Sequence, residues 1–200
     1  YTGDGVAGRT VSHNLGVAPE MMWVKQRSGS NDWSVYHSGL NVNLDGRPET
    51  DWIRLNLTNA ATDYRVWDDT APTATEFTVY DYTNVNASGG TYIAYLFATL
   101  PGVSKVGSYT GNGSSQTIDC GFTSGARFVL IKRTDSAENW LVFDTARGIN
   151  AGTDPYLKLD TTDAETNTSD YIDPYSSGFT LTSDSKTNGS GASYIFYAIA

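Results

Sequence analysis

Short runs of apolar, β-branched and aromatic residues recur along the chain, and clusters of Gly, Asn, Asp and Ser separate them. Runs of this kind are typical of β-strands. Residues 21–24 and 128–131 are continuously apolar, which predicts central strands covered on both faces. Residues 77–80 and 179–182 alternate, or nearly alternate, between apolar and polar positions, which predicts half-buried strands. No stretch has a convincing helical period, so the pattern predicts an all-β fold.

The two halves of the chain resemble each other. Residues 1–5 return as residues 109–113, and residues 92–98 return as residues 194–200. Further matched pairs are 21–25 with 128–132, 33–36 with 140–143, 52–55 with 156–159, and 77–79 with 179–181. A period of about 100 residues is too long for a solenoid or propeller unit. The repeat therefore predicts the tandem duplication of a whole small domain.

We expect each half to form an antiparallel β-sandwich of lectin-like or jelly-roll-like type, giving two tandem duplicated domains. The first domain is expected to cover residues 1–100 and the second residues 109–200. Residues 101–108 are expected to form a short joint and a lead-in strand. Because no counterpart of this lead-in stands before Tyr1, we also expect further residues upstream in a longer parent protein.

Composition and charge narrow the classes of function. The formal net charge is −9, so the protein would repel a phosphate backbone and is not expected to bind nucleic acid. No apolar run approaches the ~18–20 residues of a membrane-spanning helix, so no membrane insertion is expected. The single cysteine, Cys120, excludes an internal disulfide. His13 and His37 have no metal-ligand spacing, and no metal or other cofactor is expected.

Residues that both halves share are expected to serve the fold. Trp33 and Trp140 occupy matched positions and are interpreted as core residues, with a sugar-stacking platform as the alternative. Phe77 and Phe179 are matched in the same way and are also expected in the core.

Residues present in one half only are the candidates for ligand binding. These candidates are His37, Trp67, Asp68, Asp69, Asp144 and Arg147. Trp67 is the strongest, because Ile172 stands in its place in the other half and two carboxylates follow it. An aromatic face beside hydrogen-bond acceptors suits a sugar. The alternative is that Trp67 packs at the joint between the halves or at an oligomer interface.

Loop carboxylates could also act in pairs in glycoside hydrolysis. The available clusters are Asp68 with Asp69, Asp45 with Glu49, and Asp160 with Asp163. None of them forms a motif, and the chain has neither a nucleophile elbow nor a phosphate-binding loop. No catalytic residue is therefore expected, and a glycan-degrading enzyme is the alternative.

Several motifs taken together carry a family resemblance, most clearly in the second half. They are a Tyr-x-Gly-x-Gly opening, a strand ending in Ile-Lys-Arg-Thr-Asp, Asn-Trp-x-Val-Phe-Asp, Ser-Ser-Gly-Phe-x-Leu and Tyr-Ile-Phe-Tyr-Ala, at residues 109–113, 128–135, 139–144, 176–181 and 194–198. The chain resembles the repeat of tail-fibre-like and other virion structural proteins of tailed bacteriophages, especially marine and cyanobacterial ones. The first half departs from this frame at residues 26–28 and 75–77, and it has His37 where the second half has Asp144.

The resemblance implies a virion structural protein without catalytic residues, located on the particle surface. It is similar to a tail-fibre or surface-fibre domain that displays loops for adhesion to a host-surface glycan, with a capsid decoration or head-fibre protein as the alternative. The implied partners are other virion proteins and further copies of this chain. A homo-oligomer is expected from the many aromatic residues, which two small cores do not fully bury, and phage fibres are commonly trimeric.

Overall fold

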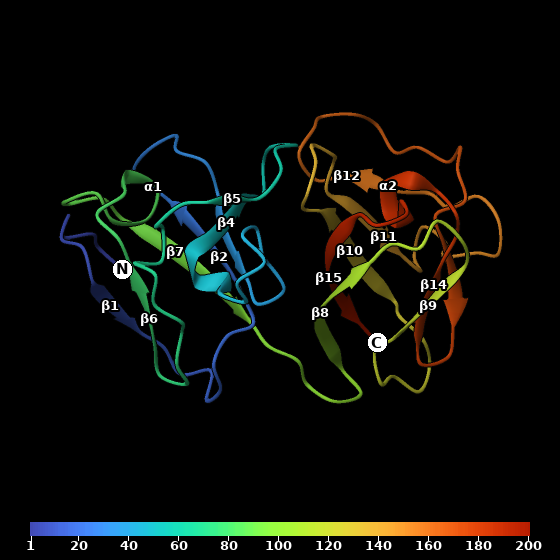
Figure 1. Ribbon diagram of the computed structural model, residues 1–200, viewed down its shortest axis with the longest axis horizontal. Coiled ribbons are helices and arrows are strands. Elements are labelled where there is room, and N and C mark those ends of the chain that lie inside the picture. The colour runs from blue at the N-terminus through green and yellow to red at the C-terminus, as the bar shows by residue number, and fades with distance from the viewer. The chain divides into compact units, whose positions relative to one another are not determined.

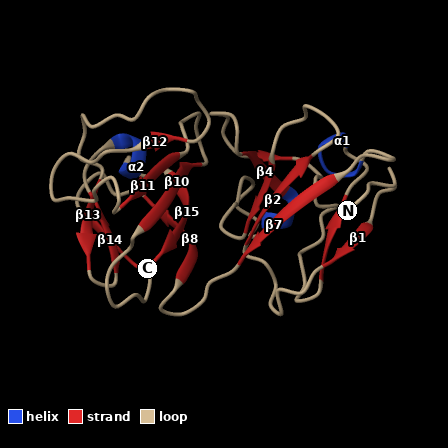
Figure 2. Ribbon diagram, turned by 180° about the vertical axis from the view of Figure 1, so that it is seen from behind, coloured by secondary structure: helices blue, strands red, loops and turns tan.

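The computed structural model of residues 1–200 is built mainly from antiparallel β-strands (Figure 1), which confirms the predicted all-β class. The chain divides into two compact units, Tyr1–Ala98 and Thr99–Ala200, here called unit 1 and unit 2. Helical segments are short in both units, as the blue ribbons of Figure 2 show.

Unit 1 contains two antiparallel sheets. Its strands are β1 (Arg9–Ser12), β2 (Met21–Gln26), β3 (Ser34–His37), β4 (Asp51–Arg54), β5 (Thr62–Asp63), β6 (Glu76–Val79) and β7 (Tyr92–Phe97). The larger sheet has the strand order β5-β4-β3-β2-β7, and the smaller one pairs β1 with β6. Two short helical turns, η1 (Pro48–Thr50) and α1 (Thr83–Asn86), connect the strands.

Unit 2 also contains a larger and a smaller antiparallel sheet. Its strands are β8 (Ser104–Thr110), β9 (Gln116–Asp119), β10 (Phe128–Arg133), β11 (Leu141–Asp144), β12 (Leu157–Lys158), β13 (Ile172–Tyr175), β14 (Gly178–Leu181) and β15 (Ser193–Ile199). The larger sheet has the order β12-β11-β10-β15-β8, and the smaller one has the order β13-β14-β9. The single helix of this unit is α2 (Ser185–Asn188).

Each unit encloses a core to which both of its sheets contribute. In unit 1, Met22 and Val24 of the central strand β2 belong to the same buried cluster as Phe77 of β6. In unit 2, Val129 of β10 belongs to the same cluster as Phe179 of β14. Each unit is therefore β-sandwich-like, and the continuously apolar runs form its central strands.

The loops at 86–90 and 188–191 begin where the single helical turns α1 and α2 end. A four-residue helix is too short to be stable alone. In unit 2, the Tyr194 hydroxyl accepts a hydrogen bond from Gly189 N at 2.9 Å and donates one to Ser185 O at 2.8 Å. In unit 1, Tyr92 makes the corresponding pair of bonds around α1. These tyrosines, both largely buried, replace the helical bonds that the short turns lack.

The interpretation of Trp33 as a core residue like Trp140 is wrong. The two backbones match, because Trp33 O accepts from Leu55 N and Trp140 O accepts from Leu159 N. Trp140 is only 1% exposed, whereas Trp33 is half-buried and stacks on Tyr95, with ring centroids 6.2 Å apart. Tyr95 lies on β7, an edge strand, and is itself 45% exposed, so it leaves part of the indole in contact with water.

Candidate functional site

The structure places Trp67 in the core of unit 1 and not on its surface. Its side chain is fully buried, and its Nε1 donates a hydrogen bond to Asp51 O at 3.1 Å. Tyr36 meets the indole edge-on, with ring centroids 6.0 Å apart and an interplanar angle of 82°. The proposed sugar-stacking role of Trp67 is therefore wrong, because no face of the ring is open. Trp67 is a packing residue within unit 1 itself.

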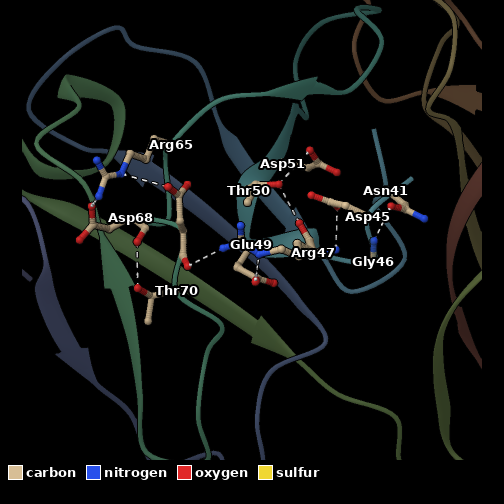
Figure 3. A network of polar contacts seen from close by, with 11 residues as sticks. Asn41, Asp45, Gly46, Arg47, Glu49, Thr50, Asp51, Arg65, Asp68 and Thr70 are labelled. Atoms are coloured by element: carbon tan, nitrogen blue, oxygen red, sulfur yellow. Dashed lines mark hydrogen bonds and ion pairs between the residues drawn. The ribbon is translucent and has the colours of Figure 1, made fainter. Parts of the chain in front are cut away.

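The carboxylates that follow Trp67 belong to a network of internal ion pairs (Figure 3). Arg65 lies between them, with nitrogen–oxygen distances of 3.0 Å to Asp68 and 3.2 Å to Asp69. Both aspartates have a positive φ, a conformation that Asp tolerates better than most residues. Arg47 adds a bond to Glu49 and a long one to Asp69 O. Asp68 and Asp69 thus fix the path of the chain after Trp67.

The other candidate residues, His37, Asp144 and Arg147, also form hydrogen bonds or ion pairs within the chain. His37 is fully buried, and its Nδ1 accepts a hydrogen bond from Gly39 N at 2.9 Å. Asp144 forms an ion pair with Arg147 and accepts from its backbone N–H at 2.9 Å. Arg147 also reaches Glu165 at 2.9 Å. The structure thus joins Asp144, the last residue of β11, and Arg147 in an ion pair of the chain itself.

Two buried carboxyl groups hold loops by accepting backbone hydrogen bonds. Asp51 accepts from Val42 N at 2.7 Å, and Asp154 accepts from Tyr171 N at 2.9 Å and from Ile172 N at 3.0 Å. Burial raises the pKa of both carboxyl groups, and these hydrogen bonds act in the opposite direction. Because their oxygens accept hydrogen bonds from the chain's own backbone, we interpret Asp51 and Asp154 as residues that stabilise the fold.

A hollow lined by aromatic and polar side chains opens beside β4 and β5 in unit 1. It has a volume of about 360 Å³. Its lining residues are Trp52, Arg54, Thr62, Asp63, Tyr64 and Tyr82, and we call it the unit 1 hollow. It combines exposed ring surface with charged and hydroxyl groups, which makes it a candidate for a ligand site.

Three aromatic rings form the wall of the unit 1 hollow. Tyr64 and Tyr82 meet edge to face, with ring centroids 5.0 Å apart. Trp52 lies 5.7 Å from Tyr82 and 6.1 Å from Tyr64. Trp52 is only 2% exposed, whereas Tyr64 is 45% exposed. Trp52 therefore anchors the wall, and Tyr64 presents the ring on which a ligand can stack.

The polar groups of the hollow supply both donors and acceptors. The Arg54 guanidinium lies over the Trp52 ring, 4.2 Å from its centroid, and its Nε is 3.2 Å from the Asp32 carboxylate. These two contacts hold the guanidinium in place. Asp63 is exposed and accepts a hydrogen bond from Asn43 at 2.6 Å. The hollow therefore presents a fixed cation and an exposed carboxylate beside the tyrosine rings.

Local structure explains why these residues meet. Trp52 and Arg54 are two positions apart on β4, so they lie on the same face of the strand. The pairing of Trp52 with Thr62 brings β5, and with it Asp63, alongside them. Tyr82 stands immediately before α1, at the end of the loop that follows β6.

Unit 2 lacks the two tyrosines of this wall. Tyr156 pairs with Thr166 as Trp52 pairs with Thr62, so Thr168 stands where unit 1 has Tyr64. Asp184 precedes α2 as Tyr82 precedes α1. The sequence analysis missed Tyr64 and Tyr82, although the comparison of the two halves contained the signal. From that comparison Trp67 was selected instead, and Trp67 is buried.

Unit 2 has a different hollow, of about 270 Å³. Its lining residues are Ser124, Gly125, Ala126, Thr145, Ile149, Pro174, Tyr175 and Ser176. It contains one aromatic ring and no charged side chain, so it has fewer groups with which to orient a polar ligand.

A family model described as a domain of unknown function (DUF7483) matches residues 1–200. Neither a curated protein nor a solved structure matches the chain. The structure has no helix of the length and apolar character that crossing a bilayer requires. It also has no group of three or more His, Cys, Asp or Glu residues arranged to hold a metal ion.

Proposed function

The chain belongs to the DUF7483 family, and we propose that it is a non-enzymatic adhesion domain that binds neutral carbohydrate in the unit 1 hollow. The observation that carries this proposal is the exposed Tyr64 ring beside Arg54 and Asp63. A sugar presents C–H groups on one face and hydroxyl groups around its edge. The tyrosine ring can stack on that face, while the arginine donates to the hydroxyl groups and the aspartate accepts from them.

Electrostatics favour a neutral ligand over a charged one. An aromatic wall can also attract a cation, but the Arg54 guanidinium already occupies the face of Trp52 and would repel a second positive charge. An anion would meet Arg54 already paired with Asp32, and a protein of net charge −9. A hydroxyl-rich neutral ligand uses the donors and acceptors of the hollow without either penalty.

We further propose that the two units are tandem duplicated β-sandwich domains. Supporting this, the order β4-β3-β2-β7 in unit 1 parallels β12-β11-β10-β15 in unit 2. The Tyr1 hydroxyl donates to Val85 O, as the Tyr109 hydroxyl donates to Thr187 O. On this proposal the shared contacts maintain the fold, and the tyrosines found only in unit 1 provide recognition.

The resemblance to tail-fibre-like repeats supports a place for the protein on the surface of a virion, in a tail fibre or surface fibre. Its partners there would be other virion proteins and further copies of this chain, most simply in a trimer. One sugar site of this kind is expected to bind weakly, with a Kd of ~mM, and several copies on one fibre raise the overall affinity through multivalency. A capsid decoration protein would use the same site from a different attachment point.

Saturation-transfer NMR with a panel of neutral and acidic oligosaccharides tests this function. We expect signals from neutral sugars with the natural protein and their loss with Tyr64→Ala. Tyr95→Ala is the matched control, because Tyr95 is also 45% exposed and also contacts a neighbouring ring. Equal signals from both variants would overturn the assignment of the site. Release of reducing ends from a host polysaccharide would overturn the non-enzymatic assignment.

A further inference from the structure

In unit 1, a carboxylate and an amide join the residues that precede β3 to those that follow β4. Asn56 Oδ1 accepts a hydrogen bond from Trp33 N at 2.9 Å, and Asn56 Nδ2 donates one to Asp32 Oδ1 at 2.9 Å. The other carboxylate oxygen of Asp32, Oδ2, lies 3.2 Å from Nε of Arg54, which lines the unit 1 hollow. One oxygen of Asp32 therefore holds the amide of the pair, and the other holds the guanidinium of the hollow.

Unit 2 has the same pair with its two residue types exchanged. Asp160 Oδ1 accepts from Trp140 N at 3.2 Å, and Asn139 Nδ2 donates to Asp160 Oδ2 at 3.2 Å. Because the backbone hydrogen bonds of Trp33 and Trp140 match, the two pairs align residue by residue. The exchanged positions are Asp32 with Asn139 and Asn56 with Asp160.

This exchange decides which partner the neighbouring cation has. Arg54 and Lys158 occupy matched positions on β4 and β12. In unit 1, Arg54 forms its ion pair with the carboxylate of Asp32. In unit 2, the matched position carries an amide, and Lys158 donates instead to Asp163 at 2.7 Å. The carboxylate before β3 is therefore the feature that ties the cation of β4 to one place.

The fold itself does not require a carboxylate at Asp32. Both side chains of its ion pair with Arg54 are partly exposed, and pairs of this kind contribute little to stability. The backbone N–H of Trp33 is satisfied by Asn56 and not by Asp32. An amide in this place completes the same loop in unit 2, where the residue is Asn139.

Two contacts determine how Arg54 presents its hydrogen-bond donors. Trp52 supports the flat face of the guanidinium, which lies 4.2 Å from the ring centroid, and Asp32 binds the Nε edge. The contact with Trp52 alone leaves the guanidinium free to turn in its own plane. Because the group is planar and rigid, a partner on one edge also fixes the directions of its other N–H groups.

We propose that Asp32 is the positioning residue of the unit 1 hollow, where it orients Arg54 for donation to the hydroxyl groups of a sugar. This inference rests on the proposed function of the hollow. Asp32 acts through Arg54, so its effect is on affinity: a guanidinium that is oriented before binding loses less conformational freedom when the sugar arrives. The exchange of the pair is then a third difference between the units, beside Tyr64 and Tyr82.

The test exchanges the pair in unit 1 with the double variant Asp32→Asn/Asn56→Asp, which keeps the net charge and reproduces the arrangement of unit 2. The Kd for a neutral oligosaccharide that binds the natural protein should rise by roughly tenfold or more, because the charge-assisted bond to Arg54 is replaced by a neutral one. The urea midpoint should stay close to that of the natural protein. Without ligand, the Arg54 Nε–H group should exchange faster with water in the variant, which reports on the guanidinium directly.

The reciprocal variant Asn139→Asp/Asp160→Asn is the matched control, because it makes the same exchange in unit 2 and should change neither the Kd nor the Arg54 signal. Asp32→Asn alone is a second variant that should also bind weakly. Its side-chain oxygen still accepts from Asn56, while an amide nitrogen replaces the oxygen that faces Arg54.

The outcomes separate this inference from the proposed function. Folded Asp32 variants that bind the sugar as tightly as the natural protein would overturn the positioning role and leave the sugar site standing. Equal losses of affinity in the unit 1 exchange and in its unit 2 control would also overturn that role. A natural protein that binds no neutral sugar would overturn the proposed function, and the positioning role with it.

Discussion

At the residue scale, Trp67 and Trp33 differ in how deeply unit 1 buries them. Trp67 lacks an aromatic counterpart in its matched position, yet it is fully buried and hydrogen-bonded in the core. Trp33 has a tryptophan counterpart and is only half-buried. In unit 2, Tyr171 contacts Phe143 of β11 as Trp67 contacts Tyr36 of β3. Tyr171 stands one position before Ile172, the counterpart of Trp67, and its ring occupies the corresponding part of the core. An aromatic residue that only one half has at a matched position therefore need not lie on the surface.

Trp67→Ala should destabilise unit 1 by ~3–5 kcal/mol, because it leaves a large cavity and deprives Asp51 O of its donor. Trp33→Ala, which removes a half-buried ring, should cost clearly less. Urea unfolding of the two variants checks this difference. A Trp67→Ala variant as stable as the natural protein would contradict its place in the core.

The buried amine of Lys132 should contribute a free energy of unfolding that rises with pH above about pH 8. Its side chain is fully buried, its Nζ donates to Glu138 O at 2.5 Å, and burial lowers the pKa of its amine from 10.5 to about 8. Above pH 8 the unfolded chain therefore holds a proton that the folded chain has released. Lys132 should therefore make the free energy of unfolding rise with pH in this window by up to ~1.4 kcal/mol per pH unit, whereas Cys120, whose thiol pKa is raised by burial, contributes in the opposite direction.

The measurement is urea unfolding of the natural protein and of Lys132→Met at pH 7.5, 8.25 and 9.0, and the comparison cancels the opposing effect of Cys120 and the tyrosines, whose pKa values burial raises. In Lys132→Met this contribution to the rise should disappear. Lys25→Met is the matched control, because the half-buried Lys25 likewise donates to loop carbonyls, those of Gly29 and Asn31. If the natural protein and Lys132→Met have the same pH dependence, the amine of Lys132 is not desolvated as described.

At the element scale, short strands and one-turn helices are held in place by buried side chains that bridge distant segments. Asn188, at the end of α2, is fully buried. Its Nδ2 donates to Ser114 O at 2.5 Å and to Thr182 O at 2.7 Å, and its Oδ1 accepts from Asn112 N at 2.9 Å. One amide thus joins three segments of unit 2.

Asn188→Ala should lower the free energy of unfolding by ~2–4 kcal/mol, since it leaves several buried backbone groups without partners. Asn188→Asp should also destabilise, because a carboxylate cannot donate to the two carbonyls. Thermal or urea unfolding detects both effects. A neutral Asn188→Ala would show that the bonds around α2 are not needed to hold it.

The strands, and the interior place of those that contain residues 21–24 and 128–131, were predictable because continuous apolar runs follow from burial on both faces. Residues 76–79 and 178–181 are more fully buried than their alternation predicted. The helical turns at Thr83–Asn86 and Ser185–Asn188 were not predictable, since four residues carry no readable period and depend on Tyr92 and Tyr194 from a following strand. The unit 1 hollow was not found either. Trp52, Tyr64 and Tyr82 are separated along the chain and meet only through the folding of β4, β5 and the loop before α1.

At the scale of the whole molecule, the two compact units share a strand plan and differ in their surfaces. On our proposal, duplication preserved the core and the buried side chains that hold the loops, such as Tyr92 and Tyr194. The surfaces of the two units then diverged. Unit 1 then carries the aromatic hollow, while unit 2 has Thr168 and Asp184 at the positions of Tyr64 and Tyr82.

Exposed aromatic side chains remain on both units, among them Tyr64, Tyr95 and Tyr175. Tyrosine is enriched in protein interfaces, so we expect the protein to form a homo-oligomer. The resemblance to phage fibres implies that this oligomer is a trimer. Multi-angle light scattering over a range of concentrations measures this directly. A mass of about three chains supports the trimer, and a constant monomer mass up to high concentration would contradict it.

The most direct test of the central claim is a ¹⁵N NMR titration of the protein with a neutral oligosaccharide that gives a saturation-transfer signal. The account predicts that shifts concentrate at Arg54, Thr62, Asp63, Tyr64 and Tyr82, including the Arg54 Nε–H group. The corresponding positions of unit 2, such as Lys158 and Thr168, should remain unchanged. Shifts that cluster away from the unit 1 hollow, or that appear equally in both units, would contradict the claim that the tyrosines found only in unit 1 make the binding site.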